Sequence, residues 1–337
     1  MKNILDQAAK KATLFHIRTT ENITWEKLNS MAYQPDTALD GSNKRMGLVH
    51  PLSTLDIAPE ADVLEKFDGG FIGTLRIDSS VITATAIKQA AAVRIKEKSN
   101  QLPPGVKLSK EERESITMAV RMQLLKGAAE VTTHVPFIID LANSRLIIFS
   151  TKPDVLNAIT LRINNMFSAE LELLEYSSFA VKADILNISA KLLEKLKLYH
   201  ESHVADAQEV TFNHCPDLSF GMGMKLISLD DTSGNHGNFP SIDVTDDSLG
   251  NLITRATGIE KLGLFLVHNT CDLEFTINSK LQFEKLGLAS VLLNGVQSDD
   301  QQDPTGEIRA TAQIIADTVN FMQKNVINWL GMSEHIR

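Results

Sequence analysis

The sequence predicts an α+β fold in which mixed β-sheets are flanked by helices. Short runs that alternate apolar and polar residues are typical of half-buried strands, and they occur near residue 13, from residue 71 and between residues 261 and 278. Longer segments rich in Ala, Leu, Lys and Glu lie between these runs and favour helices. The 337 residues are about twice the usual domain length, so we expect two or three regions that share a sizeable core.

We expect three such regions. They are a β-rich central region at 1–180 with an inserted helical arm at about 84–128, a second subdomain with acidic loops at 181–260, and C-terminal strands with a helix at 261–337.

The N-terminal region begins with an expected strand, TLFHIRT, followed by a helix at 22–32, a Gly, Asn and Pro loop at 35–53 and a strand, FIGTLRID. A pair of helices follows. The first, TATAIKQAAAVRIKEK, ends where Pro103, Pro104 and Gly105 prevent its continuation. The second begins after Ser109, which has Glu112 three residues later, the spacing of a capping box. The two helices therefore form a pair joined by a rigid elbow.

The rest of the chain alternates strands and helices. HVPFIIDLANSRLIIFS reads as a β-hairpin, and a helix follows with Pro153 in its first turn. Residues 185–203 carry a helix-period apolar stripe that is typical of core packing, and a further helix should be capped near Asp246. Strands return at KLGLFLV and DLEFTIN, before a last helix from about 309 to 330.

The composition is that of an ordinary water-soluble protein, with 43% hydrophobic and 22% charged residues and a net charge of −9. No segment approaches the roughly 18 uncharged apolar residues of a membrane span, and the N-terminus lacks the apolar region of a secretory signal. Cys215 and Cys271 lie far apart without CxxC spacing, which predicts two buried thiols in a reducing compartment. We therefore expect a cytoplasmic protein without a membrane partner.

Positive charge gathers in one segment of this acidic chain. Residues 86–130 hold nine cationic and five anionic side chains, a local charge of +4 that leaves −13 for the rest. Such asymmetry is a hint of a patch that meets a polyanion, although a solvated helical face is the simpler interpretation. The nine cations are Lys88, Arg94, Lys96, Lys98, Lys107, Lys110, Arg113, Arg121 and Lys126.

The last helix carries a stripe that is close to a heptad, formed by Ile315, Val319, Met322, Val326 and Trp329. This is more apolar surface than a peripheral helix needs. We expect the stripe to form a dimer contact; the alternative is that it covers the core of its own chain.

Catalytic and cofactor motifs are weak or missing. SFGMGMKL lacks the spacing and the hydroxyl of a phosphate-binding loop, there is no GxSxG, and His200, His203, His214 and Cys215 do not form HExxH. A nuclease could hold divalent ions with Asp230, Asp231, Asp246 and Asp247, but no lysine has a carboxylate two positions before it, so a [DE]xK core is missing. We expect no catalytic residue, no cofactor and no metal.

An ordered set of segments resembles the bacterial recombination-associated RdgC family over most of the chain. These are SMAYQP, MGLVHPL, AIKQA, Leu124–Leu125 followed by FIIDLANSRLIIFSTK, and EKLGLFL through LEFTINSKLQFEKLGL. The resemblance implies a crescent-shaped α/β subunit of a ring-shaped homodimer that encircles duplex DNA, is associated with the nucleoid and limits a RecA-type recombinase. It also implies that the AIKQ helix contacts phosphates, with Lys88 the best match.

The chain departs from this family in two segments, and it also has an inserted helix near 189–203 and an N-terminal extension of about ten residues. Leu125 is followed by Lys126, Gly127, Ala128 and Ala129 where the family has Pro, Arg, any residue and Phe, and SIDVTDD is acidic where relatives are basic. We predict a non-enzymatic protein that binds duplex DNA, with single-stranded DNA as a further candidate ligand. The alternatives are a metal-dependent exonuclease and an interaction module for a recombinase.

Overall fold

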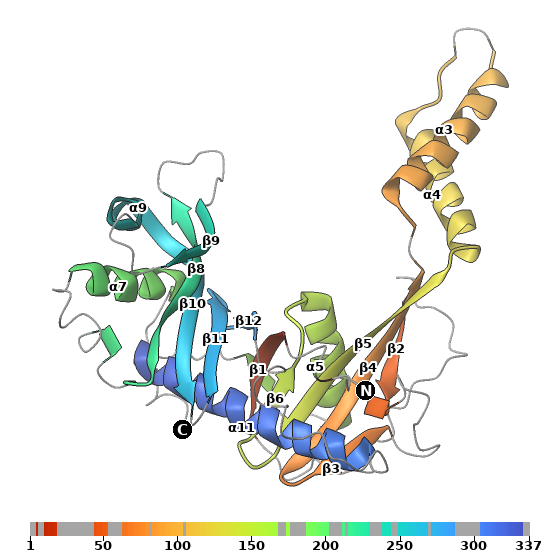
Figure 1. Cartoon of the computed structure of the whole chain (residues 1–337). Coiled ribbons are helices and arrows are strands. Elements are labelled where there is room, and N and C mark those ends of the chain that lie inside the picture. Colours follow the sequence, from red (N-terminus) through yellow and green to blue (C-terminus); the bar gives the residue numbers. More distant parts are fainter. Residues whose placement is uncertain are drawn as a thin grey trace. The chain divides into compact units, whose positions relative to one another are not determined.

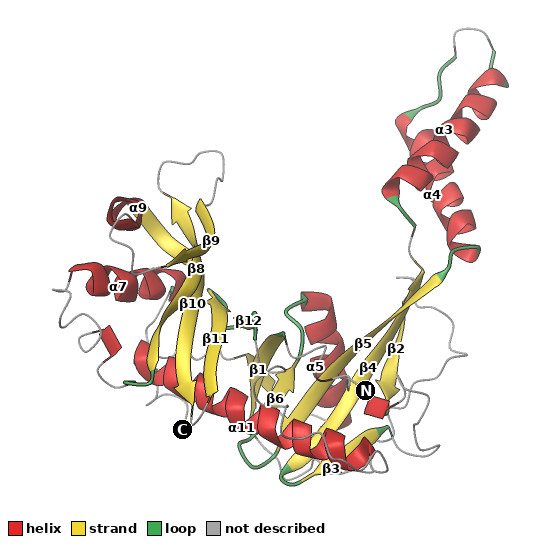
Figure 2. Cartoon of the chain, in the orientation of Figure 1, coloured by secondary structure: helices red, strands yellow, loops and turns green. Residues whose placement is uncertain are grey.

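The structure is a computed structural model of the whole chain. It describes residues 5, 10–18, 44–52, 63–80, 82–103, 106–167, 173–175, 187–201, 211–212, 215–228, 237–243, 249–268, 271–286 and 304–332. The expected helix at 22–32 and the expected helix cap at Asp246 lie outside these residues. Figure 1 shows the elements along the chain, and Figure 2 separates helices from strands.

The first half of the chain contains β1 (Lys11–Ile17), β2 (Lys44–Val49), β3 (Leu64–Phe67), β4 (Gly70–Ser80), α3 (Ala84–Asn100), α4 (Lys110–Lys126), β5 (Glu130–Asp140), β6 (Arg145–Ile148) and α5 (Pro153–Phe167). The second half contains β7 (Leu173–Glu175), α7 (Ile188–Glu201), β8 (Leu218–Ser228), β9 (Gly237–Asp243), α9 (Gly250–Arg255), β10 (Ala256–His268), β11 (Cys271–Asn278), β12 (Phe283–Glu284) and α11 (Pro304–Leu330). The expected helical pair, the hairpin, the helix that begins at Pro153 and the C-terminal strands and helix are thus confirmed.

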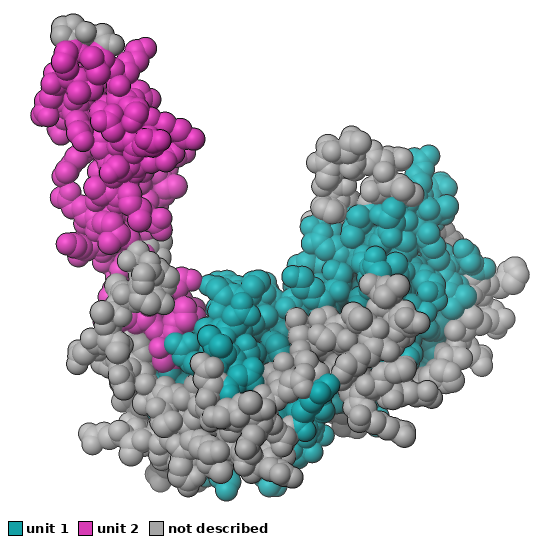
Figure 3. All heavy atoms as spheres, turned by 180° about the vertical axis from the view of Figure 1, so that it is seen from behind, with its two compact units in different colours: residues 1–32, 48–75, 135–337 teal, residues 33–47, 76–134 magenta. Residues whose placement is uncertain are grey.

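The chain divides into two compact units, which Figure 3 colours separately. Unit 1 comprises residues 1–32, 48–75 and 135–337, and unit 2 comprises residues 33–47 and 76–134. The helical arm expected at about 84–128 falls within unit 2. The regions expected at 181–260 and 261–337 both fall within unit 1.

The described strands form one open sheet of the α+β class, flanked by helices. Its order is β2-β4-β5-β6-β1-β12-β11-β10-β8-β9, with β3 paired to β4 and β7 paired to β1. The strand pairs with a described register are antiparallel, for example Phe137 opposite Ile148 in the β5–β6 hairpin and Leu264 opposite Phe275 in β10–β11. We expected mixed sheets; short turns between neighbouring strands favour antiparallel pairing instead.

Helix α7 packs against β10, as its apolar stripe predicts. Leu192, Leu193 and Leu196 are buried in the core cluster of unit 1. The approach is close at Gly258, where an added Cβ would lie 2.3 Å from the Oγ of Ser189. A glycine at this position of β10 therefore allows the helix to reach the sheet.

The apolar stripe of α11 also lies in the core of its own chain. Trp329 stacks on Phe212 with a ring-centroid distance of 5.3 Å, and its Nε1–H donates to the carbonyl oxygen of Thr211 at 3.1 Å. The exposed fractions of Ile315, Val319, Met322, Val326 and Trp329 are 0–3%. Our assignment of these five residues to a dimer contact is therefore corrected, because their side chains have almost no exposed surface to offer a second copy. Dimerisation itself stays a prediction.

Polar contacts fix α11 to the β5–β6 turn. Asn320 donates from Nδ2 to Oδ2 of Asp140 at 2.6 Å, and its Oδ1 accepts a hydrogen bond from Arg145. Across the part of the chain that the structure describes, α11 included, no helix is long and apolar enough to span a membrane.

Candidate nucleic-acid interface

The arm consists of α3 and α4, two antiparallel helices of 17 residues each that lie side by side (Figure 1). Thr83 begins α3 by accepting the backbone N–H of Ala86 on its hydroxyl oxygen at 3.2 Å. Ser109 begins α4 with the predicted capping box: its Oγ accepts the N–H of Glu112 at 3.1 Å, and Glu112 Oε2 accepts the N–H of Ser109 at 2.8 Å. These caps satisfy backbone donors that each helix would otherwise leave free.

The two helices bury little of their own surface. Ala91 is the buried residue of α3 and Val120 is that of α4. Across the arm, Arg94 Nη2 donates to Gln123 Oε1 at 2.7 Å. Because so few side chains are needed for the contact between the helices, most of the surface of the arm is free for another role.

The nine predicted cationic residues are all exposed, and the structure brings them together on this one arm. Eight lie on the helices and Lys107 lies in the connection between them. Lys110 forms an ion pair with Glu114 at 3.9 Å, with side chains 91% and 68% exposed. Ion pairs this exposed contribute little, so Lys110 remains available to an anionic ligand.

The helical period divides the cations of α3 between two sides of the arm. An α-helix turns by about 100° per residue, so directions can be counted from Ala91, which faces α4. Lys88 and Lys96 then point about 60° and 140° to one side. Arg94 points about 60° to the other side.

The same count on α4 starts from Val120, which faces α3. Because the helices are antiparallel, equal rotations on both helices point to the same side of the arm. Lys110 and Arg121 lie about 80° and 100° toward the side of Lys88, while Gln123 lies about 60° toward the side of Arg94. The hydrogen bond between Arg94 and Gln123 agrees with this assignment.

We call Lys88, Lys96, Lys110 and Arg121 the basic side of the arm. The carboxylate of Glu114 also points there, so four cations and one anion give this side a charge of +3. On the opposite side Arg94 and Lys126 are balanced by Glu97 and Glu112. Lys98 and Arg113 point along the contact between the helices. The excess positive charge of residues 86–130 is therefore concentrated on one side, which the charge count alone did not reveal.

A buried carboxylate braces the strands that carry the arm. Asp78 on β4 is 1% exposed, and its Oδ1 accepts hydrogen bonds from Arg76 Nε at 3.1 Å and from Thr132 Oγ1 on β5 at 2.6 Å. Arg76 Nη2 also lies 3.1 Å from Oδ2. Because β4 leads into α3 and β5 follows α4, these contacts join the two strands at the base of the arm. Sequence reasoning missed Asp78; the available signal was a lone carboxylate inside an apolar strand.

Two further contacts lie near this brace. Arg45 on β2 forms an ion pair with Glu130 on β5. His134 on β5 is partly buried: burial first, and then the Arg76 guanidinium, lower its pKa, while Asp78 opposes the shift. The imidazole is therefore neutral at neutral pH and adds nothing to the positive charge of the arm.

Motifs that were considered for other chemistry have structural explanations or lie outside the described residues. SFGMGMKL is part of strand β8, and Gly263 on β10 faces its bulge: an added Cβ at Gly263 would lie 2.2 Å from the carbonyl oxygen of Met222. Close strand approach thus requires a residue without a side chain there. Among the residues that the structure describes, no group of three His, Cys, Asp or Glu side chains could hold a metal ion. His203, His214, Asp230, Asp231, Asp246 and Asp247 lie outside the description.

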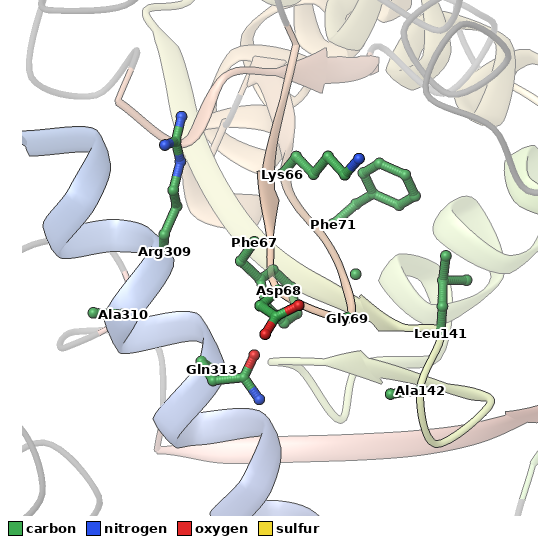
Figure 4. Close-up of a pocket in the computed structure, with 11 residues that line it drawn as sticks. Lys66, Phe67, Asp68, Gly69, Phe71, Leu141, Ala142, Arg309, Ala310 and Gln313 are labelled. Carbon is green, nitrogen blue, oxygen red and sulfur yellow. The ribbon is translucent and has the colours of Figure 1, made fainter.

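A pocket of about 810 Å³ lies in unit 1 between the β3–β4 turn and α11 (Figure 4). Its walls are mainly apolar, with Lys66, Asp68, Arg309 and Gln313 as its polar side chains. Arg309 donates from Nε to Glu65, whose other oxygen lies 3.2 Å from Nε2 of His50. Glu65 accepts a hydrogen bond from the guanidinium of Arg309, and Asp68 adds a carboxylate to the lining, so these cations do not form an anion site comparable to the arm.

A scan of the chain against protein-family models and a search of curated proteins both give no match. Membership of the RdgC family therefore stays a prediction that rests on the ordered segments of the sequence.

Proposed function

We propose that this protein binds DNA without marked sequence preference, through the basic side of the arm. The observation that carries the proposal is the concentration of Lys88, Lys96, Lys110 and Arg121 on one exposed side, in a chain with a net charge of −9. Phosphates supply most of the affinity of non-specific complexes, and Lys and Arg are the residues that neutralise them. The negative remainder of the surface favours contact through the arm rather than elsewhere.

The spacing of these cations suits a ligand with repeating charge. Lys88 and Lys96 lie about 12 Å apart along α3, and Lys110 and Arg121 about 16 Å apart along α4. Duplex DNA carries one phosphate charge per about 1.7 Å of its axis, so phosphates lie within reach in any register. A ligand with this charge density needs no particular base sequence to bind.

The biological setting follows from the resemblance to the RdgC family. On that basis the protein acts as a ring-shaped homodimer around duplex DNA, in the cytoplasm at the nucleoid, and limits a RecA-type recombinase. The crescent shape of the subunit, the ring and the recombinase partner belong to this proposal.

Two matched double variants test the role of the basic side. Lys96→Ala with Arg121→Ala removes one cation per helix from the basic side, and Lys98→Ala with Arg113→Ala removes one cation per helix from outside it. Both pairs are exposed, and Ala favours helix, so folding should be preserved. Fluorescence anisotropy with a labelled duplex should show weaker binding and a salt slope smaller by about 1.8 per copy for the first pair, and a clearly smaller change for the second. Equal effects of the two pairs would refute binding through one side of the arm. If neither pair changes binding, the arm is not the DNA-binding site.

The exonuclease alternative has its own test. Incubation of the protein with end-labelled duplex and Mg²⁺ should give no shortened products. Products that disappear in the Asp246→Asn, Asp247→Asn variant would replace the proposal with metal-dependent hydrolysis.

A further inference from the structure

The outward face of β8, β10 and β11 carries an apolar patch. Phe265 and Val267 alternate along β10 with the buried Leu264 and Leu266, so they point away from the core. Val267 is 45% exposed, and Met222 on the neighbouring β8 is 54% exposed. Large apolar side chains gathered on a sheet face in this way mark a surface that another molecule can cover.

Carboxylates border this patch along β11. Asp272 lies opposite Val267, and Glu274 lies opposite Phe265. Both are exposed, and neither forms an ion pair within the described part of the chain. One oxygen of Glu274 accepts the backbone N–H of Met222 at 3.2 Å, which fixes the carboxylate beside the apolar side chains. We call Met222, Phe265, Val267, Asp272 and Glu274 the acidic-apolar face.

The arm carries a row of complementary chemistry. Met118, Met122 and Lys126 succeed one another on α4 at intervals of four residues, so they form one row, directed away from α3. The two methionines are 57% and 47% exposed, and Lys126 is exposed beside them. This row is separate from the basic side, so it can be covered while the basic side contacts DNA.

The dimensions of the row and the face match. The row is about 12 Å long, from eight residues of helical rise. Three adjacent strands span about 10 Å between the outer two. When Met118 and Met122 pack on Phe265 and Val267, Lys126 reaches the neighbouring strand β11, where Asp272 and Glu274 lie.

We infer that the acidic-apolar face binds the Met118–Met122–Lys126 row of a second copy of this chain. A second copy is the occupant that the molecule itself supplies, since it presents methionines and an ammonium group where the face presents apolar side chains and carboxylates. In a twofold dimer each copy gives its row and receives the row of the other, so the contact forms twice. One such contact buries a small area, but the two contacts of the dimer together bury the larger area that a stable interface needs. This inference rests on the proposed homodimer but not on DNA binding.

Cross-linking between isotope-labelled copies tests the contact directly. A mixture of ¹⁴N and ¹⁵N protein is treated with a carbodiimide, which joins a lysine ammonium to a carboxylate with loss of water. Mass spectrometry should find Lys126 linked to Asp272 or Glu274 in peptide pairs that combine both isotopes. Links between these residues only within one isotope, or no link, would overturn the inference.

Variants and the mass in solution separate this contact from other dimers. Met118→Ser with Met122→Ser should raise the dimer dissociation constant at least tenfold in sedimentation, while Leu161→Ser, a control at a 61% exposed leucine of α5, should not. Lys126→Glu should weaken the dimer, and Asp272→Lys with Glu274→Lys in the same chain should restore it. A monomeric wild-type protein would overturn both the dimer and this contact. A dimer that the methionine variant leaves unchanged would overturn the contact alone.

Discussion

Replacing Trp329 with Phe should destabilise the chain whether or not it dimerises. The change keeps an aromatic ring against Phe212 but removes the Nε1–H that donates to the buried carbonyl oxygen of Thr211. Leaving that acceptor without a partner costs about 1–3 kcal/mol, and the smaller ring leaves unfilled volume that costs roughly 1 kcal/mol more. We expect the free energy of unfolding to fall by about 2–4 kcal/mol.

Urea unfolding followed by far-ultraviolet circular dichroism measures this change. The loss should be the same at every protein concentration, since Trp329 contacts only its own chain in this account. Leu161→Ala is a matched control, because Leu161 is a large apolar residue that is 61% exposed, and it should change stability by less than about 0.5 kcal/mol. A Trp329→Phe variant as stable as the wild type, or a loss seen only at concentrations where a dimer dissociates, would refute the assignment of this stripe to the core.

Two further predictions concern single residues of the sheet. Gly263→Ala should lower the melting temperature strongly in differential scanning fluorimetry, because the added Cβ would lie 2.2 Å from the backbone oxygen of Met222, which cannot move aside. A variant as stable as the wild type would show that the β8 bulge does not lie against Gly263. The lowered pKa of His134 means that the unfolded chain binds more protons than the folded chain as the pH falls below about 6.5. The free energy of unfolding should therefore fall as the pH drops from about 6.5 through the pKa of His134 in the folded chain. The His134→Gln variant should lose less stability than the wild type over this range. Equal losses would contradict a lowered pKa of His134.

Local chemistry made much of the fold predictable. The capping box at Ser109, the turn between β5 and β6 and the helix that begins at Pro153 each depend on residues close together in the chain. Such signals are physical constraints on the backbone itself. They can therefore be identified in the sequence without knowing the tertiary contacts.

What covers an apolar surface could not be predicted in the same way. The period of Ile315, Val319 and Met322 shows that one face of α11 is apolar, but a core and a subunit contact require the same pattern. Likewise the spacing of SFGMGMKL excluded a phosphate-binding loop, but its pairing as strand β8 with β10, with Gly263 close to Met222, depends on strand register. Both answers come from contacts between residues that are distant in sequence.

The candidate site was predictable in part. Charge counting found the nine cations, but it treated them as one cluster. Their division between two sides requires the direction in which α3 and α4 face each other, which Ala91 and Val120 define. Once that direction is known, the helical period alone assigns each cation to a side.

The salt dependence of DNA binding tests the central claim most directly. The dissociation constant of the wild-type protein should be measured on several duplexes of equal length and unrelated sequence, between 50 and 200 mM salt. If a dimer makes roughly six phosphate contacts, affinity should fall by about three decades over this range, with the same slope on every duplex. A shallow slope, or affinities that depend on base sequence more than on salt, would contradict binding by phosphate contacts from the basic side of the arm.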